Sequence, residues 1–123
     1  MWLFTRHGFY SLTRSKQEPH KLQVRARVRL DLENLQTLTG LTEPILETTD
    51  SDYRWRMIVT PVDGEYLVSL LTHDIDYTNF KGVVAKQPDQ SAKLTGLHAI
   101  WEIHHGWQSD DASIRTMALK SCS

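Results

Sequence analysis

Two segments of the chain alternate strictly between apolar and polar side chains. In residues 24–30 the valine, alanine and leucine side chains fall on one face and three arginines on the other, and residues 53–59 repeat the arrangement with two arginines before Pro61. Alternation with a period of two is typical of a strand that is buried on one face. We therefore expect two half-buried strands, and the second ends at the proline because proline cannot donate a ladder hydrogen bond.

Composition indicates shorter strands elsewhere in the first half. Residues 1–5 and 9–13 are rich in aromatic and β-branched types, and Gly8 permits a bend, so this stretch predicts two short strands or one bent strand. The polar residues 14–21 follow as a loop. A further short strand is expected at residues 45–49.

Leucines at helical spacing mark the segments between and after these strands. A first helix runs from Asp31, which can cap it, to Gly40. A second covers residues 64–73 with Asp63 as its cap. After a link rich in aspartate, a short third helix must end before Pro88.

The last predicted helix begins near Ser91 and ends before Gly106. Its apolar residues recur every three or four positions, as in a helix that packs along one side. The side chains expected to face inward are Leu94, Leu97, Ile100, Trp101 and His104. Residues 108–123 are polar enough to form a frayed tail, with a weak helix at residues 111–119 as the alternative.

Strands in the first half and helices in the second indicate an α+β fold. We expect an antiparallel sheet of three to five strands with helices packed on one face. A ferredoxin-like sheet is the nearest common arrangement, although its element order differs from the one predicted here. The length of 123 residues suits one hydrophobic core, so residues 1–107 are assigned to a single α+β domain and residues 108–123 to a polar C-terminal tail.

Charge is unevenly divided along the chain. The formal net charge is −1, which argues against a strongly basic nucleic-acid binder, yet residues 1–29 carry seven basic side chains and only one acidic. Residues 30–123 carry seven basic and fourteen acidic side chains. This asymmetry predicts either a local anion-binding surface or pairing of the basic segment with an acidic one within the protein.

Neither a membrane nor an oxidising compartment is indicated. No apolar run approaches the roughly 18 residues that a membrane span needs, and Arg6 follows the apolar start too soon for a signal peptide. The single cysteine, Cys122, argues against an internal disulfide framework and a cysteine-rich zinc site, and we expect its thiol to be inert. These features predict a cytoplasmic protein without a membrane partner.

The arginines of the two alternating segments form the main candidate site. If both strands join one sheet, its polar face carries Arg25, Arg27, Arg29, Arg54 and Arg56. Side chains on neighbouring strands lie about 5 Å apart, so these charges need a counter-ion. An anionic ligand bound bidentately would provide one, with Tyr10 and Trp55 available to stack a base. Carboxylates of the chain itself, from residues 50–52 or from Asp74 and Asp76, would do so equally.

Two further clusters have the residue types of a metal site. His73, Asp74 and Asp76 could ligate a divalent cation and, with the arginines, would suit phosphodiester chemistry. The simpler interpretation is a helix end at which Asp76 caps the next helix. The second cluster, at zinc-like spacing on one helix face, comprises His98, Glu102 and His105. It lacks a further ligand, so ordinary exposed histidines are expected there, and no motif for a cofactor is present.

Five short blocks of the sequence resemble a family of small uncharacterised bacterial proteins. The blocks are MWLFT and GFYS near the N-terminus, VRAR and DYRWR in the two arginine segments, and DIDYTNFK in the acidic link. The likeness spans most of residues 1–105, and an origin in a phage or mobile element would fit so small a protein. The resemblance implies no activity, cofactor or catalytic residue. It favours a single surface built from both arginine segments and the acidic link.

The sequence therefore predicts a binding protein rather than an enzyme. Its arginine face would engage an anionic partner, namely a nucleic acid, a nucleotide or an acidic protein surface. One alternative is an interaction or inhibitor protein that presents Trp2 and Phe4, and another is a metal-dependent phosphoesterase or nuclease based on His73, Asp74 and Asp76. Whether Trp2 and Phe4 lie in the core or at an interface stays open, and a homodimer is compatible with the sequence.

Overall fold

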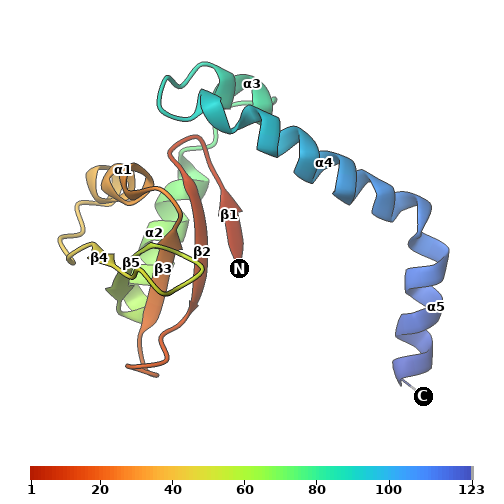
Figure 1. The fold of residues 1–123 in the computed structure, drawn as a ribbon, viewed down its shortest axis with the longest axis horizontal. Coiled ribbons are helices and arrows are strands. Elements are labelled where there is room, and N and C mark those ends of the chain that lie inside the picture. The colour runs from red at the N-terminus through yellow and green to blue at the C-terminus, as the bar shows by residue number, and fades with distance from the viewer. Residues whose placement is uncertain (123) are drawn as a thin grey trace.

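The protein consists of one β-sheet and a set of helices (Figure 1). The computed structural model describes residues 1–122. The strands are β1 (Trp2–Phe4), β2 (Phe9–Arg14), β3 (Leu22–Ala26), β4 (Leu46–Glu47) and β5 (Trp55–Val59). The helices are α1 (Arg29–Thr39), α2 (Pro61–His73), α3 (Phe80–Ala85), α4 (Leu94–Ser109) and α5 (Asp111–Cys122), with a 3₁₀ turn η1 (Ser91–Lys93). The predicted α+β class is confirmed.

The five strands form one open sheet in the order β1-β2-β3-β5-β4. Every neighbouring pair is antiparallel, as predicted. The element order β-β-β-α-β-β-α differs from the β-α-β-β-α-β order of a ferredoxin-like fold, so that arrangement does not describe this topology. The two edge strands are short, with three residues in β1 and two in β4.

Helices α1 and α2 pack on one face of the sheet (Figure 1). Apolar side chains from alternate strand positions meet leucines of both helices there and form the hydrophobic core. Its buried members are Tyr10, Leu12, Val24, Ala26, Leu32, Leu35, Met57, Val59, Leu67 and Leu71. The opposite face is left without a covering helix in the described part of the chain (Figure 1).

The strand predicted over residues 24–30 ends earlier than its alternation suggests. β3 stops at Ala26, the chain bends, and α1 begins at Arg29. Val28 holds the cap position of α1 without a side-chain hydrogen bond. Asp31, which we expected to cap this helix, lies in its first turn with a buried side chain, because its carboxylate binds groups from other segments.

The next two helices are also capped by residues other than the predicted ones. Thr60 rather than Asp63 caps α2, since its hydroxyl accepts the Asp63 N–H and Pro61 takes the first helical position. Asn79 rather than Asp76 caps α3 by accepting a backbone N–H of the first turn. Asp76 is thereby left to bind another segment.

Helices α4 and α5 leave the compact part of the protein and project away from it (Figure 1). Leu97 is buried, whereas residues 101–121 are all exposed. Trp101 and His104, expected to face inward, therefore lie on the surface, because the core does not extend that far along α4. We call residues 98–121 the helical arm.

The C-terminal segment is more regular than predicted. α5 is helical over Asp111–Cys122, so the structure shows a continuous helix where we expected a frayed tail or a weak helix. The side chain of Cys122 and residue 123 lie outside the described residues, and the inert thiol stays a prediction. None of the described helices combines the length and the apolar composition that a membrane crossing requires.

Candidate functional site

One row of cross-strand neighbours runs across the sheet face that no helix covers. Trp2 pairs with Ser11, Ser11 with Arg25, and Arg25 with Arg56. Paired residues project to the same side of a sheet, about 5 Å apart. Two of the predicted arginines are therefore direct neighbours, with a tryptophan in line with them. We call this surface the uncovered face because no helix lies on it, although Ser11 is buried and the loop 48–53 packs on Arg25 and Arg56. It comprises Trp2, Phe4, Phe9, Ser11, Arg25, Arg27, Tyr53 and Arg56.

Three aromatic rings lie at the β1–β2 end of the uncovered face. The ring centre of Phe4 is 6.3 Å from that of Trp2 and 4.8 Å from that of Phe9. Trp2 is 66% exposed, which settles that it belongs to the surface and not to the core. Phe4 and Phe9 are half-buried beside it. The tryptophan thus offers a supported, open ring on which a planar ligand can stack.

Arg25 and Arg56 are held in place by neutral groups. Arg25 Nη2 donates to Ser11 Oγ at 2.8 Å, and its Nε is buried without an acceptor. Arg56 donates to Gln23 Oε1 at 2.9 Å and to hydroxyl oxygens of the loop 48–51. Within residues 1–122 neither guanidinium has a carboxylate partner. Two adjacent positive charges are therefore fixed in position without a counter-ion.

Tyr53 brings Arg27 to the same surface. The Cζ atoms of Arg25 and Arg27 lie 4.5 and 4.2 Å from the centre of the Tyr53 ring. Arg27 Nη1 also binds Asp52 Oδ1 at 3.2 Å, as expected for the acidic turn, but these side chains are 59% and 78% exposed. An ion pair so open to water contributes little to stability.

The other two predicted arginines belong to a different surface. Arg29 starts α1, and Arg54 precedes β5, with Cζ atoms 5.2 and 5.6 Å from the ring centre of Trp55. Each has a carboxylate of its own, at 2.9 Å from Arg29 to Glu33 and at 2.8 Å from Arg54 to Glu47. The expected ladder of five is thus reduced to three arginines, because the chain leaves the sheet after β3.

Neither aromatic residue that we expected to stack a ligand is placed to do so. Tyr10 is 2% exposed on the helix-covered face, where its hydroxyl donates to the Asp31 carbonyl at 2.7 Å. Burial raises the pKa of this phenol, which keeps it a neutral donor. Trp55 is opposite Ala26 in the ladder and packs against the core. Alternate residues of a strand point to opposite faces of the sheet, and both residues lie at positions that face away from the side of Arg25.

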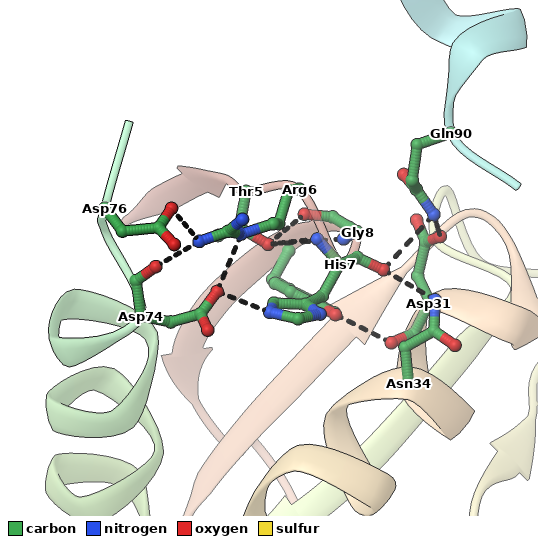
Figure 2. Close-up of polar contacts among 10 residues, drawn as sticks. Thr5, Arg6, His7, Gly8, Asp31, Asn34, Asp74, Asp76 and Gln90 are labelled. Atoms are coloured by element: carbon green, nitrogen blue, oxygen red, sulfur yellow. Dashed lines mark hydrogen bonds and ion pairs between the residues drawn. The ribbon is translucent and has the colours of Figure 1, made fainter. Parts of the chain in front are cut away.

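A second polar cluster joins the β1–β2 loop to the end of α2 (Figure 2). Arg6 donates from Nε to Asp74 Oδ2 at 2.9 Å and from Nη2 to Asp76 Oδ1 at 2.6 Å and to the Asp74 carbonyl. His7 Nε2 lies 2.7 Å from the same Asp74 Oδ2. We call these four residues, together with Asp31, the polar junction.

Asp31 ties the junction to more distant parts of the chain. Its carboxylate accepts the Phe9 N–H at 3.1 Å and Gln90 Nε2 at 2.9 Å, and it contacts Lys93 Nζ. Gln90, which is fully buried, also donates to the carbonyl of His7 (Figure 2). A buried carboxylate persists only when it is paired and hydrogen-bonded, and these contacts meet that requirement.

Electrostatics in the junction favour the charged forms of Asp74 and Arg6. Burial alone would raise the pKa of Asp74, but the hydrogen bonds and charges of His7 and Arg6 outweigh it and hold this pKa below its usual range. Burial also opposes the charge of Arg6, yet hydrogen bonds to Asp76 and Asp74 raise its pKa. The junction is therefore a set of mutually satisfied charges that fastens the β1–β2 loop to α2.

The acidic residues of the predicted metal cluster are engaged by this junction. Asp74 and Asp76 both bind Arg6, whose fixed charge would repel a cation, and the neighbouring His73 is exposed at the end of α2. On α4, His105 stacks on Trp101 with ring centres 4.8 Å apart. Among residues 1–122 no group of three or more histidine, cysteine or acidic side chains is arranged to hold a metal ion.

Sequence reasoning missed three components of these surfaces. Tyr53 was placed on an apolar strand face, although it precedes β5 and contacts two arginines. Arg6 and Asp31 gave no periodic signal, because their partners lie up to 70 residues away. The sheet face on which Trp2 lies could be identified only from the β1–β2 register.

Comparison with known proteins adds no constraint. No family model, no curated protein and no solved structure matches the chain. The inferences below rest on the geometry of the uncovered face and of the helical arm.

Proposed function

We propose that the protein binds single-stranded nucleic acid on the uncovered face. The observation that carries this proposal is the row in which Trp2, Ser11, Arg25 and Arg56 follow one another across the sheet. A single strand presents alternating planar bases and phosphates, and proteins bind it by stacking the bases on aromatic rings while cations track the backbone. The row supplies both kinds of group on one rigid support.

The stacking partner is Trp2, the outermost ring of the aromatic group. It is exposed on one side and backed by Phe4, so a base can cover it without displacing the core. Stacking on such a ring is worth about 1–3 kcal/mol per base and tolerates any base. This geometry favours binding with little sequence preference.

The phosphate-binding groups are Arg25 and Arg56, with Arg27 beside them. Guanidinium groups bind phosphate bidentately, and these two have neutral neighbours in place of a carboxylate that a phosphate would have to displace. With an overall charge of −1, attraction is local to this face and therefore sensitive to salt.

Salt-dependent binding of a labelled oligonucleotide tests the proposal. Fluorescence anisotropy of a mixed-sequence single-stranded DNA and of the same RNA sequence would be followed from low to physiological salt. We expect the double variant Arg25→Gln, Arg56→Gln to weaken binding and to flatten the plot of log K against log salt by about 1.4, because each lost phosphate contact removes roughly 0.7 from the slope. Trp2→Ala should weaken binding about 5- to 150-fold without changing this slope.

The chain offers a matched control for the charge change. Arg29→Gln with Arg54→Gln removes the same two charges next to Trp55, where both arginines already have carboxylate partners. This variant should bind the oligonucleotide as the unaltered protein does. Equal losses in both double variants would show that only net charge matters, and absence of binding at low salt would refute the proposal.

A further inference from the structure

Helix α4 has two apolar faces, of which only one meets the rest of the protein. The first includes the buried Leu97 and continues to Trp101, whose ring centre lies 5.1 Å from Nζ of Lys81 in α3. The second contains Ile103, which is 62% exposed, and Trp107, which is 53% exposed. Nothing in residues 1–122 covers this second face.

The uncovered side chains of the arm recur with the spacing of a helix–helix seam. Apolar residues separated alternately by three and four positions form one stripe along a helix, and such stripes pair with other helices. The spacing resumes in α5 after Asp110, the single residue between the two helices, at which the chain changes direction (Figure 1). We call this set the apolar stripe, and its members are Ile100, Ile103, Trp107, Ile114 and Met117.

The charge pattern of α4 is that of an interface rather than of a solvated helix. Over its 16 residues α4 contains one formally charged side chain, Glu102, and this residue lies on a different face from the stripe. Depletion of charge together with enrichment in tryptophan and methionine distinguishes the centre of a protein interface from other surface. The stripe holds Trp107 and Met117 and no charged residue.

The isolated arm also lacks the contacts that normally stabilise a helix. Helices shorter than about 12–15 residues are marginal in water without tertiary packing, and α5 has 12 residues with every described side chain exposed. Its apolar groups Ile114, Met117 and Leu119 are 48–73% exposed. A partner that buries them would supply the missing packing.

We infer that the apolar stripe of one molecule pairs with the apolar stripe of a second copy. Exposed side chains of this size present roughly 100 Å² each, so the five members of the stripe offer about 500 Å² per molecule. Two copies then bury about 1,000 Å², which is the lower bound expected of a specific interface. The arms form the dimer, and the uncovered sheet face stays free.

The apolar stripe is complementary to a second copy of itself. The stripe contains no charge that would demand a complementary charge opposite, so it is its own complement across a two-fold axis. Both copies bury their tryptophans in one event, and no other part of the described chain has to move.

The oligomeric state of the full-length protein tests this inference. Sedimentation velocity should show a dimer in the micromolar range. The variant Ile103→Glu, Trp107→Glu should weaken the dimer about 100-fold, as expected for two central interface residues, and it should leave oligonucleotide binding per chain in place. The two sites are separate, so failure of either proposal is distinguishable from failure of the other.

Two substitutions on the polar side of the same helix provide the control. Thr95→Glu with His98→Glu also introduces two carboxylates into α4, but at exposed positions outside the stripe. This variant should remain dimeric. A monomeric unaltered protein, or a dimer that survives Ile103→Glu with Trp107→Glu, overturns the inference.

Discussion

Asp74→Asn is the sharpest perturbation of the polar junction, because Asp76 provides an internal comparison. Both carboxylates bind the guanidinium of Arg6, but the Asp74 side chain is 31% exposed and that of Asp76 is 77% exposed. Asp74 Oδ2 accepts from Arg6 Nε at 2.9 Å and contacts His7 Nε2 at 2.7 Å. Replacement by the isosteric amide keeps the shape and removes the charge from both contacts.

The expected loss follows from these two contacts. A hydrogen bond to a charged group exceeds a neutral one by about 1 kcal/mol, so Asp74→Asn should lower the free energy of unfolding by about 2 kcal/mol at pH 7. Asp76→Asn should cost at most about 0.5 kcal/mol, since water already screens that carboxylate. For a chain of this size the difference corresponds to roughly 5–8 °C in Tm.

Urea denaturation at several pH values measures the effect and its sign. The pKa of Asp74 is held below its usual range in the folded protein, so its stabilisation is fully present above the unfolded pKa of about 3.9 and is lost as pH falls through the folded value. The gap between the unaltered protein and Asp74→Asn should therefore close below about pH 4. A gap that persists at pH 2, or an equal cost for Asp76→Asn, would refute this account of the junction.

Two further substitutions test the packing around the β1–β2 loop and the assignment of Tyr10. Gly8→Ala should destabilise the protein by about 1–3 kcal/mol in urea denaturation, because the new Cβ would lie 2.6 Å from Asp31 Cβ. Gly96→Ala in α4 is the control and should be neutral or slightly stabilising, because a Cβ there would contact nothing within 4 Å outside its own helix turn. Equal effects of the two substitutions would contradict the close approach at Gly8. Tyr10→Phe removes one buried hydrogen bond and should lower the free energy of unfolding by about 1 kcal/mol, with oligonucleotide binding unchanged. A loss of binding would show that Tyr10 does belong to the binding site.

The fold was predictable from the sequence where local pattern and tertiary structure agree. Alternation in residues 53–59 and leucine spacing after residue 31 identified β5, α1 and the sheet faces to which their apolar side chains belong. Gly40 ends α1 as predicted, with a φ of 74° that favours glycine. Such signals are carried by neighbours in the chain.

Prediction was wrong where the same pattern fits two structures. Residues 24–30 alternate throughout, yet the chain leaves the sheet at Ala26, so Arg29 lies on a helix and Arg25 is the one arginine of this segment within the ladder, opposite Arg56. Alternation cannot show where a strand ends when the next helix begins within the same run.

The polar junction was beyond sequence reasoning for a different reason. Its contacts join segments separated by about 60–80 residues, for example Asp31 to Gln90 and His7 to Gln90. No periodicity along the chain records such a meeting of side chains. The prediction that Asp76 caps a helix was wrong because Arg6, brought close by the sheet, binds that carboxylate.

The brevity of the two outermost strands limits how the protein can meet other chains. Three residues in β1 and two in β4 leave few free backbone N–H and C=O groups along either edge. An extended peptide or a partly unfolded neighbour would find too short a template for strand addition. Fibrous self-association by edge-to-edge growth is thereby disfavoured.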